Sequence, residues 1–375
     1  MKLICERDAL NRALHCVVAR ARNKTKIPIL AHVKVEARDN RLTLTATDLD
    51  SEAVASCAAE VASPGARAVP ADRLAQIVAG WAAGSQVEME MRDNETQLRC
   101  GRSRYTLNTL DAAEFPVMPE PRNPSEFALG CVDARTLFGD PQAAILIDGS
   151  RKMLEGGYLY QSDATQLSVV ATDGVRYIRR TITTGATLVG RYIVPKTAMA
   201  EIVKLATEGE IRFRCGENLI EVIGPHMSFK SKLIEATYPD TERLIAKLRS
   251  QYILIDRADI LAAIKRLTAV AGQSPRIDLQ WSDDGQPLEM TLSGEGSGTE
   301  QLGCESDAPK GQLTFSPSFL AEMLSVPKGD TVQLHYEYGV ANKPLRIFDP
   351  SDDGLIVMVM PCREVVAQSR AAEAA

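Results

Sequence analysis

The apolar positions of the chain describe one amphipathic helix that occurs three times. In residues 194–204, apolar side chains recur at the i, i+3, i+4 spacing of a single buried stripe, and the proline near the start falls where a helix has no intrahelical N–H bond to lose. Residues 69–78 and 315–324 repeat this pattern. The corresponding apolar positions, 125 and 121 residues apart, are Leu74, Met199 and Leu320. The spacing predicts three similar repeats.

Each repeat opens with a second helical pattern. Residues 7–20 and 257–267 place apolar side chains on one face, and Asp256 is the predicted N-cap of the later helix. In the middle repeat the pattern starts at residues 132–138, but Pro141 follows and cannot continue a helix. The sequence therefore predicts a shortened or broken helix there.

Between the helices the pattern changes to strict alternation, which is typical of half-buried antiparallel strands. Short Asp-, Asn- and Gly-containing turns separate these segments. The clearest alternating stretches are residues 41–47, 87–91, 211–215 and 331–336. Two helices and about eight strands per repeat predict an α+β fold rather than βαβ units.

Two repeated signatures place the boundaries between the repeats. Residues 46–50 resemble residues 171–175, and Phe115-Pro116 resembles Tyr238-Pro239 at a distance of 123 residues. A proline-rich stretch at 118–124 is typical of a linker. The predicted domains are an N-terminal domain, a central domain, a C-terminal domain and a tail, at residues 1–120, 126–245, 251–363 and 364–375.

Composition limits the class of protein. Of the 375 residues 45% are hydrophobic, 25% are charged and 5% are aromatic, and the net charge is −6. The scarcity of aromatic residues argues against a protein that binds single-stranded nucleic acid by stacking on its bases. The sequence has no apolar run of about 20 residues, so no membrane span is predicted. Charged residues at the N-terminus interrupt any signal-peptide core, so we expect a cytoplasmic protein. The eight scattered cysteines predict reduced, buried thiols.

No catalytic constellation is visible. The chain lacks the phosphate-binding loop G-x-x-x-x-G-K-[ST], the nucleophile motif G-x-S-x-G and the zinc motif H-E-x-x-H, and its histidines and cysteines lack metal-ligand spacing. The acidic pairs Asp48/Asp50 and Asp352/Asp353 could bind metal, but we favour turn-capping roles for them. We predict no catalytic residue, no metal site and no cofactor.

Several short motifs occur together in one order. They are Ile27-Pro28-Ile29-Leu30, Ala46-Thr47-Asp48-Leu49, Gly101-Arg102-Ser103-Arg104-Tyr105, Glu114-Phe115-Pro116, Ala171-Thr172-Asp173-Gly174-Val175-Arg176, Ile193-Val194-Pro195-Lys196, Ser231-Lys232-Leu233, Tyr238-Pro239-Asp240 and Val359-Met360-Pro361-Cys362-Arg363. In this order and spacing the chain resembles the β subunit of bacterial DNA polymerase III, the sliding-clamp family, over residues 1–363. The resemblance implies a head-to-tail homodimer closed into a ring of six similar domains, lined by helices.

The resemblance also implies a function. A family member encircles double-stranded DNA without sequence specificity, acts as a non-catalytic processivity factor of DNA replication, and is cytoplasmic, associating with the nucleoid during replication. Its partners are the DNA polymerase III α subunit, the clamp loader, and other polymerases and repair factors that carry clamp-binding motifs. The residues expected near DNA, from family positions and neighbouring basic residues, are Arg20, Arg22, Lys24, Arg73, Arg151, Lys152 and Lys196. For basic residues on helices, a solvated face is the alternative interpretation.

Partners of the family bind through short peptides, and the resemblance implies a pocket for them. Its residues here are Leu154, Thr172, Gly174, Val175, Arg176, Tyr177, Pro239, Arg243, Leu244, Ser316, Phe319, Met358, Met360, Pro361, Cys362 and Arg363. The alternative interpretation of residues 358–360 is an edge strand that covers a core, and this is compatible with a pocket role. Val175 stands where relatives often have His and Cys362 replaces a usual Met, so a pocket with altered partner preference is expected. Lys152-Met153 stands where relatives often have tyrosines near DNA, so phosphate contacts from Arg151 and Lys152 are expected in place of tyrosine contacts.

The subunit contact is expected between an edge strand near residue 105 and the third domain of a second copy. Its predicted residues are Tyr105, Leu107, Leu267 and Val270. An alternative function is a clamp-fold peptide-binding adaptor, or a specialised paralogue with altered DNA loading, which the divergent first helix of the middle repeat motivates. The Ala-rich tail either shields the pocket or is a frayed terminus.

Overall fold

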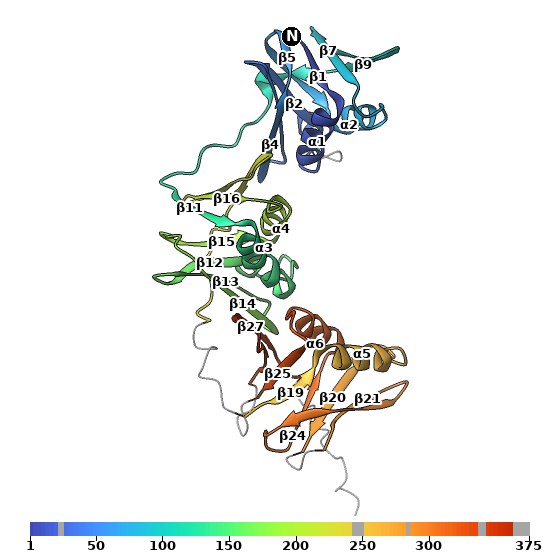
Figure 1. Cartoon of the computed structure of the whole chain (residues 1–375), viewed down its shortest axis with the longest axis vertical. Helices are drawn as coiled ribbons and strands as arrows, with labels where there is room; N and C mark the ends of the chain where they lie inside the picture. The colour runs from blue at the N-terminus through green and yellow to red at the C-terminus, as the bar shows by residue number, and fades with distance from the viewer. Residues whose placement is uncertain (22–25, 242–250, 283–285, 337–342, 363–375) are drawn as a thin grey trace, which may run out of the picture. The chain divides into compact units, whose positions relative to one another are not determined.

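A computed structural model of the chain describes residues 1–21, 26–241, 251–282, 286–336 and 343–362 (Figure 1). The chain packs into two compact units. Unit 1 contains residues 1–139, 163–165 and 184–235, and unit 2 contains residues 140–162, 166–183 and 236–375. The middle repeat contributes to both units. The predicted boundaries between the three domains stay a prediction.

The first repeat lies wholly in unit 1. Its elements are β1 (Lys2–Glu6), α1 (Arg7–Val18), η1 (Pro28–Ala31), β2 (His32–Arg38), β3 (Arg41–Thr47), β4 (Ser51–Ala58), β5 (Glu60–Ser63), β6 (Gly65–Pro70), α2 (Ala71–Ala79), β7 (Gln86–Arg92), β8 (Glu95–Cys100), β9 (Ser103–Asn108), β10 (Leu110–Asp111) and η2 (Ala112–Glu114).

The other two repeats follow the same order of elements. The middle repeat comprises β11 (Ser125–Gly130), α3 (Cys131–Gly139), η3 (Asp140–Ala144), η4 (Lys152–Leu154), β12 (Gly156–Asp163), β13 (Gln166–Thr172), β14 (Arg176–Thr183), β15 (Arg191–Pro195), α4 (Lys196–Leu205), β16 (Glu210–Cys215), β17 (Leu219–Ile223) and β18 (Met227–Lys232). The last repeat comprises β19 (Ile253–Asp256), α5 (Arg257–Thr268), β20 (Arg276–Trp281), β21 (Leu288–Ser293), β22 (Gly298–Leu302), β23 (Cys304–Ser306), β24 (Gly311–Phe315), α6 (Pro317–Leu324), β25 (Thr331–His335), β26 (Leu345–Asp349) and β27 (Asp352–Val359).

Antiparallel sheets form the framework of unit 1. One sheet has the strand order β5-β1-β7-β8-β9, which leaves β9 at an edge, and the other runs β10-β6-β2-β3-β4-β18-β17-β16-β11. The pairing of β4 with β18, in which Ser51 lies opposite Ser231, joins the first repeat to the middle one. A continuous sheet therefore crosses this junction between repeats.

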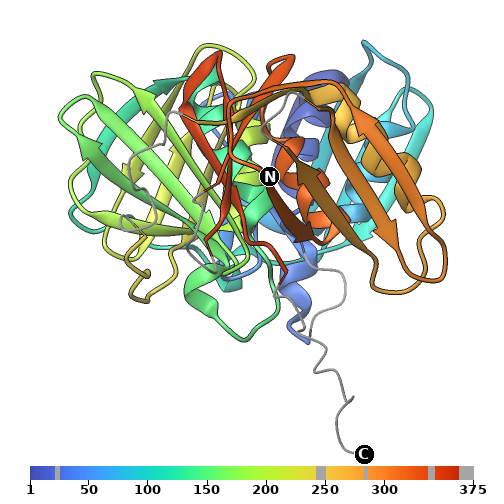
Figure 2. The ribbon, with the colours of Figure 1, turned by 90° about the horizontal axis from the view of Figure 1, so that it is seen from below.

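In unit 2, strand pairing also continues a sheet across the next junction between repeats. Its strands run β12-β13-β14-β27-β26-β25-β19-β23 in one sheet and β22-β21-β20-β24 in another, which leaves β22 at an edge. The pairing of β14 with β27, in which Arg176 lies opposite Val359, joins the middle repeat to the last one. Figure 2 shows α5 and α6 beside the orange strands of this repeat.

The helices pack in pairs, α1 on α2, α3 on α4 and α5 on α6, and their predicted apolar stripes are buried. Leu74, Met199 and Leu320 are fully buried, as the triplicate pattern predicts. The Asp256 side chain accepts a hydrogen bond from the backbone N–H of Asp259 at 2.9 Å, which confirms the predicted N-cap. The broken first helix of the middle repeat is also confirmed, because α3 ends at Gly139 and a 3-10 turn containing Pro141 follows.

Two expectations need correction. All eight cysteines are free, but only Cys5, Cys57 and Cys215 are buried. The other five are half-buried, because Cys16 lies at the edge of the buried face of α1 and the remaining four lie at or beyond the ends of elements. Asp48 caps a turn as expected, accepting from the backbone N–H of Ser51 at 2.7 Å. The turn-capping interpretation is wrong for Asp352, because its carboxylate forms an ion pair with the buried Arg180 of unit 2.

Candidate functional site

The basic residues expected near DNA occupy different environments. Arg73 is exposed in the first turn of α2, and Lys196, the first residue of α4, is half-buried. Lys152 is exposed in the short helix η4. Arg22 and Lys24 lie outside the described residues. The equivalent first turns of α2 and α4 therefore each present one basic residue.

Arg20 forms an ion pair within unit 1. Its guanidinium Nη2 donates to Glu201 Oε1 at 3.0 Å, and only 16% of its side chain is exposed. Glu201 lies on α4 and also accepts from Lys204 at 2.9 Å. The ion pair thus joins the end of the first helix of the chain to the middle repeat, which gives Arg20 a structural bond across the β4–β18 junction.

Arg151 contacts the predicted peptide pocket. Its Nη2 donates to the backbone carbonyl of Asp173 at 2.7 Å. A Cβ added to Gly174 would lie 3.0 Å from the Arg151 guanidinium, and the φ of Gly174 is +91°, a conformation that favours glycine. Arg151 is therefore placed to support the turn at 172–176, in addition to its expected contact with DNA.

Unit 2 brings the described pocket residues onto neighbouring elements. The Thr172 hydroxyl donates to the carbonyl of Arg176 at 2.7 Å, and Asp173 Oδ1 accepts from the backbone N–H of Arg176 at 2.7 Å, so the turn between β13 and β14 is tightly fixed. The backbone N–H of Met360 donates to the Val175 carbonyl at 2.8 Å, and that of Cys362 donates to Thr314 at 2.7 Å. These bonds hold the C-terminal segment beside the turn.

The pocket residues differ in burial. Leu154, Tyr177 and Met358 are buried, whereas Met360, Pro361 and Cys362 are half-buried. Val175 and Pro239 are exposed, and Ser316 at the start of α6 is half-buried. Residues 358 and 359 belong to β27, so the edge-strand alternative for them is wrong, because β26 pairs on the other side of that strand. Arg243, Leu244 and Arg363 lie outside the described residues.

Arg176 lies in a cluster that the sequence left unassigned. Its guanidinium donates to Asp173 Oδ2 at 2.8 Å, pairs with Glu322, and lies 4.6 Å from the ring centroid of Phe319. The two carboxylates and the aromatic face hold the side chain in one orientation. Glu322 could have been found from its place one helical turn after Phe319 on an expected pocket helix.

The Phe319 ring lies under the Arg176 guanidinium and is predicted to form part of the apolar wall of the peptide pocket. Replacing Phe319 with alanine is expected to weaken binding of a hydrophobic clamp-binding peptide by about 1–2 kcal/mol, roughly tenfold in the dissociation constant. Fluorescence anisotropy with a labelled peptide measures this change. Phe319→Tyr keeps the ring and is the control, and equal loss in both variants would contradict a platform role.

The expected subunit residues divide into exposed and buried pairs. Tyr105 on the edge strand β9 is 46% exposed, and its ring lies 5.9 Å from that of Trp81. Leu107 is buried in unit 1. In unit 2, Val270 after α5 is exposed and Leu267 is buried. Of these four predicted residues, Tyr105 and Val270 therefore have side chains exposed for a contact.

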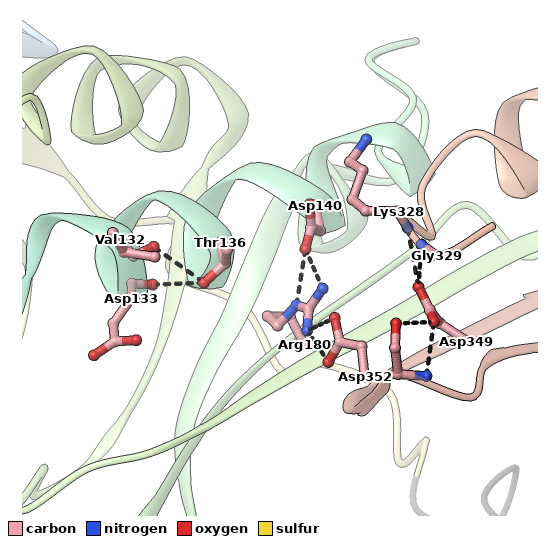
Figure 3. A network of polar contacts seen from close by, with 10 residues as sticks. Val132, Asp133, Thr136, Asp140, Arg180, Lys328, Gly329, Asp349 and Asp352 are labelled. Carbon is pink, nitrogen blue, oxygen red and sulfur yellow. Dashed lines mark hydrogen bonds and ion pairs between the residues drawn. The ribbon is translucent and has the colours of Figure 1, made fainter.

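Arg180 forms a buried network in unit 2 that the sequence did not indicate (Figure 3). Its guanidinium donates to Asp140 Oδ2 at 2.5 Å and to both carboxylate oxygens of Asp352 at 2.7 Å. Burial raises the pKa of Asp140, and the Arg180 charge opposes that rise. The network ties the turn after α3 to β14 and β27, which compensates for the helix that Pro141 ends.

Within the part of the chain that the structure describes, no group of three or more His, Cys, Asp or Glu residues is arranged to hold a metal ion. In the same residues, no helix has the length and apolarity to cross a membrane.

Three repeats of paired helices and antiparallel sheets, joined edge to edge at both internal junctions, define the class of DNA-clamp folds. Models of the DNA polymerase III beta subunit match the chain at residues 1–119 (N-terminal domain), 135–240 (central domain) and 242–363 (C-terminal domain). The chain belongs to the DNA polymerase III beta subunit family, and its α+β fold of three clamp domains is confirmed.

Individual relatives agree with this family. The beta sliding clamps of Salmonella typhimurium and Pseudomonas aeruginosa are 26% and 27% identical to the chain, over 97% of it and 100% of each relative. Among solved structures, the DNA polymerase III subunit beta from Pseudomonas aeruginosa and the sliding clamp from Caulobacter crescentus each have a TM-score of 0.91 at 26% identity. Both alignments cover 97% of this chain and 100% of theirs.

Proposed function

We propose that the chain is a DNA sliding clamp: a processivity factor that encircles duplex DNA without reading its sequence and tethers a polymerase through the pocket in unit 2. The observation that carries this proposal is the pattern of strand edges. At both internal junctions, the third strand after the first helix of one repeat pairs with the last strand of the following repeat. These pairs are β4 with β18 and β14 with β27.

One pair of equivalent strands is left over. By position in their repeats, β9 corresponds to β18 and β27, and β22 corresponds to β4 and β14; both are sheet edges. Exposed edges are ready templates for strand pairing. Pairing β9 of one copy with β22 of a second copy repeats the internal junction twice more and closes a head-to-tail dimer of six domains. The proposed domains are residues 1–120, 126–245 and 251–363.

A closed ring holds DNA by topology and needs no base contacts. Phosphate contacts from Lys and Arg carry no sequence information, so they permit sliding. Arg73, Lys152 and Lys196 are proposed to supply these contacts, together with Arg151, Arg22 and Lys24. The overall charge of −6 suits a ring whose basic residues are gathered on one surface. No step of this function requires catalysis, so the chain is proposed to be non-catalytic.

The pocket in unit 2 is proposed to receive short peptides from the polymerase III α subunit, the clamp loader and other polymerases or repair factors. A sliding clamp from Pseudomonas aeruginosa, 26% identical to this chain, has been solved bound to griselimycin. The half-buried thioether of Met360 suits varied apolar ligands, because methionine repacks easily. This function places the protein in the cytoplasm, on the nucleoid during replication.

Retention on DNA tests the proposal. Protein loaded by the clamp loader is expected to stay on a nicked circular plasmid and to leave once a restriction enzyme linearises that plasmid. Gel filtration of the protein–DNA mixture measures the retained fraction. Binding that is equally stable on circular and linear DNA, and that salt removes, would replace the topological function with ordinary electrostatic binding.

Charge reversal separates the clamp from the adaptor alternative. Arg73→Glu combined with Lys196→Glu is expected to shorten retention on circular DNA about tenfold at low salt, because two phosphate contacts become repulsive. Peptide binding in unit 2 should stay unchanged. Asp72→Lys, on the turn that also carries Arg73, controls for altered helix charge. A protein that binds the peptide but is never retained on circular DNA, with or without these substitutions, would favour the peptide-binding adaptor.

A further inference from the structure

Unit 1 contains a cavity of about 260 Å³ that the proposed function does not use. It lies where β4 and β18 join the first two repeats, and the linker after the first repeat forms one wall. The lining residues that matter here are Thr47, Leu49, Pro116, Val117, Lys232 and Glu235. The lining is mostly apolar, and Leu49 and Val117 are exposed at the surface.

The cavity and the pocket in unit 2 share a backbone frame, meaning the hydrogen-bonded turn at residues 47–51 or 172–176 and the strand bonded beside it. Here the Thr47 hydroxyl donates to the Ser51 carbonyl at 2.8 Å, as Thr172 does to Arg176 at 2.7 Å. The backbone N–H of Leu49 donates to Thr47 Oγ1 at 3.1 Å. The equivalent bond in unit 2, from the N–H of Gly174 to Thr172 Oγ1, has the same length. The two turns are therefore the same structure, used at successive junctions.

The strand that closes each site also matches. The backbone N–H of Lys232 donates to the Asp50 carbonyl at 2.9 Å, and that of Met360 donates to the Val175 carbonyl at 2.8 Å. Pro116 lines the cavity at the position that Pro239 holds in the later repeat. A frame that suits an extended peptide at one junction is thus present at the other.

The side chains on this frame differ. Leu49 has a φ of +75°, a left-handed conformation that costs a leucine energy, whereas the equivalent Gly174 adopts φ +91° without a Cβ. The strained backbone presents the Leu49 side chain to the cavity, where it adds an apolar wall. Strain of this kind is concentrated at ligand sites.

The charges of the lining select a ligand. Lys232 Nζ lies 3.2 Å from Asp50 Oδ1, so this cation already has its counter-ion. Glu235 lines the cavity, is exposed, and has no ion-pair or hydrogen-bond partner among the described residues. The site therefore offers an apolar cavity large enough for one or two side chains, next to one unmatched carboxylate.

We infer that this cavity is a second peptide-binding site, whose ligand is a short linear segment with a bulky apolar side chain followed by an arginine or lysine. The apolar side chain enters between Leu49 and Val117, and the cation pairs with Glu235. The comparison of frames rests on the proposed role of the pocket in unit 2, but the cavity itself does not. A partner carrying two different motifs would bind the clamp at two junctions at once.

The test uses the full-length protein and a fluorescein-labelled hexapeptide that contains Leu-Phe-Arg. Leu49→Gly removes the apolar wall while keeping a backbone that Gly174 shows to be favourable, and Glu235→Lys reverses the charge. Each is expected to raise the dissociation constant about tenfold by anisotropy. Asp93→Gly, at another position of positive φ in unit 1, is the matched control and should change nothing.

A charge-swapped peptide, Leu-Phe-Glu, is expected to bind Glu235→Lys better than it binds the original protein. Val175→Asp places a charge in the unit 2 pocket and should leave the Leu-Phe-Arg peptide unaffected. If Val175→Asp abolishes binding and Leu49→Gly does not, the peptide binds in unit 2, and the inference fails while the clamp function stands. Absence of binding, or equal affinity in all variants, overturns the inference as well. Loss of retention on circular DNA would overturn the proposed function alone.

Discussion

Replacing Tyr105 with aspartate is expected to halve the mass of the particle in solution, from about twice 40.8 kDa to 40.8 kDa. Tyr105 is 46% exposed on β9, the edge that is proposed to pair with β22 of a second copy. Pairing would bury the new carboxylate without a counter-ion. A buried unpaired charge at the centre of an interface weakens association by about 100-fold or more. Multi-angle light scattering across a dilution series measures the change.

Two controls make this result specific. Tyr105→Phe keeps the ring that packs on Trp81 and should stay dimeric, since the ring centroids lie 5.9 Å apart and the hydroxyl is not needed for that contact. Val132→Asp puts the same charge on an exposed apolar position elsewhere in unit 1 and should also stay dimeric. A dimeric Tyr105→Asp protein would place the subunit contact elsewhere. A monomer should also be lost from circular DNA.

Replacing Arg180 with methionine is expected to lower the free energy of unfolding by about 3 kcal/mol near neutral pH. The change leaves Asp140 and Asp352 without the guanidinium that both contact, and Arg180 is 7% exposed in its side chain. Because the Asp352 side chain is one-third exposed, the expected decrease in the free energy of unfolding lies at the lower end of the range for a broken buried ion pair. Urea denaturation measures it, and Arg212→Met, an exposed arginine on β16, is the control.

The pH dependence of the Arg180→Met protein gives a second readout. Burial already raises the pKa of Asp140 in the folded chain, and without Arg180 nothing nearby opposes that rise as strongly. A carboxyl group with a raised folded pKa favours the folded state below the unfolded pKa, and this contribution is lost as pH rises through the folded pKa. The variant should therefore regain stability relative to the original protein as the pH falls from 7 toward about 4. A constant difference would show that Asp140 keeps its charge.

Local patterns determined the elements of this protein well. Helical stripes around Leu74, Met199 and Leu320 predicted buried faces, and Asp256 and Pro141 predicted where helices begin and end. These features depend on residues within one or two turns of each other, so periodicity and capping chemistry are sufficient to find them. The order of short motifs then identified the family.

The same patterns could not assign partners to individual charged side chains. Arg20 was expected near DNA, yet its guanidinium is paired with Glu201 from a different repeat. Asp352 was expected to cap a turn, yet it is paired with Arg180. Both pairs join residues that are more than 170 positions apart in the sequence. Composition and local spacing carry no information about which distant charge will be nearby.

By itself, the sequence determined that the chain has three repeats of two helices and antiparallel strands, and that it belongs with the polymerase clamps. Only the tertiary structure decided which strand edges are used and which stay open, and only it showed that the frame of the peptide pocket occurs again beside Leu49. The physical reason is that a strand carries the same alternating pattern whether its edge is paired or free. Edge pairing depends on register between distant segments, which appears only when the sheets are assembled.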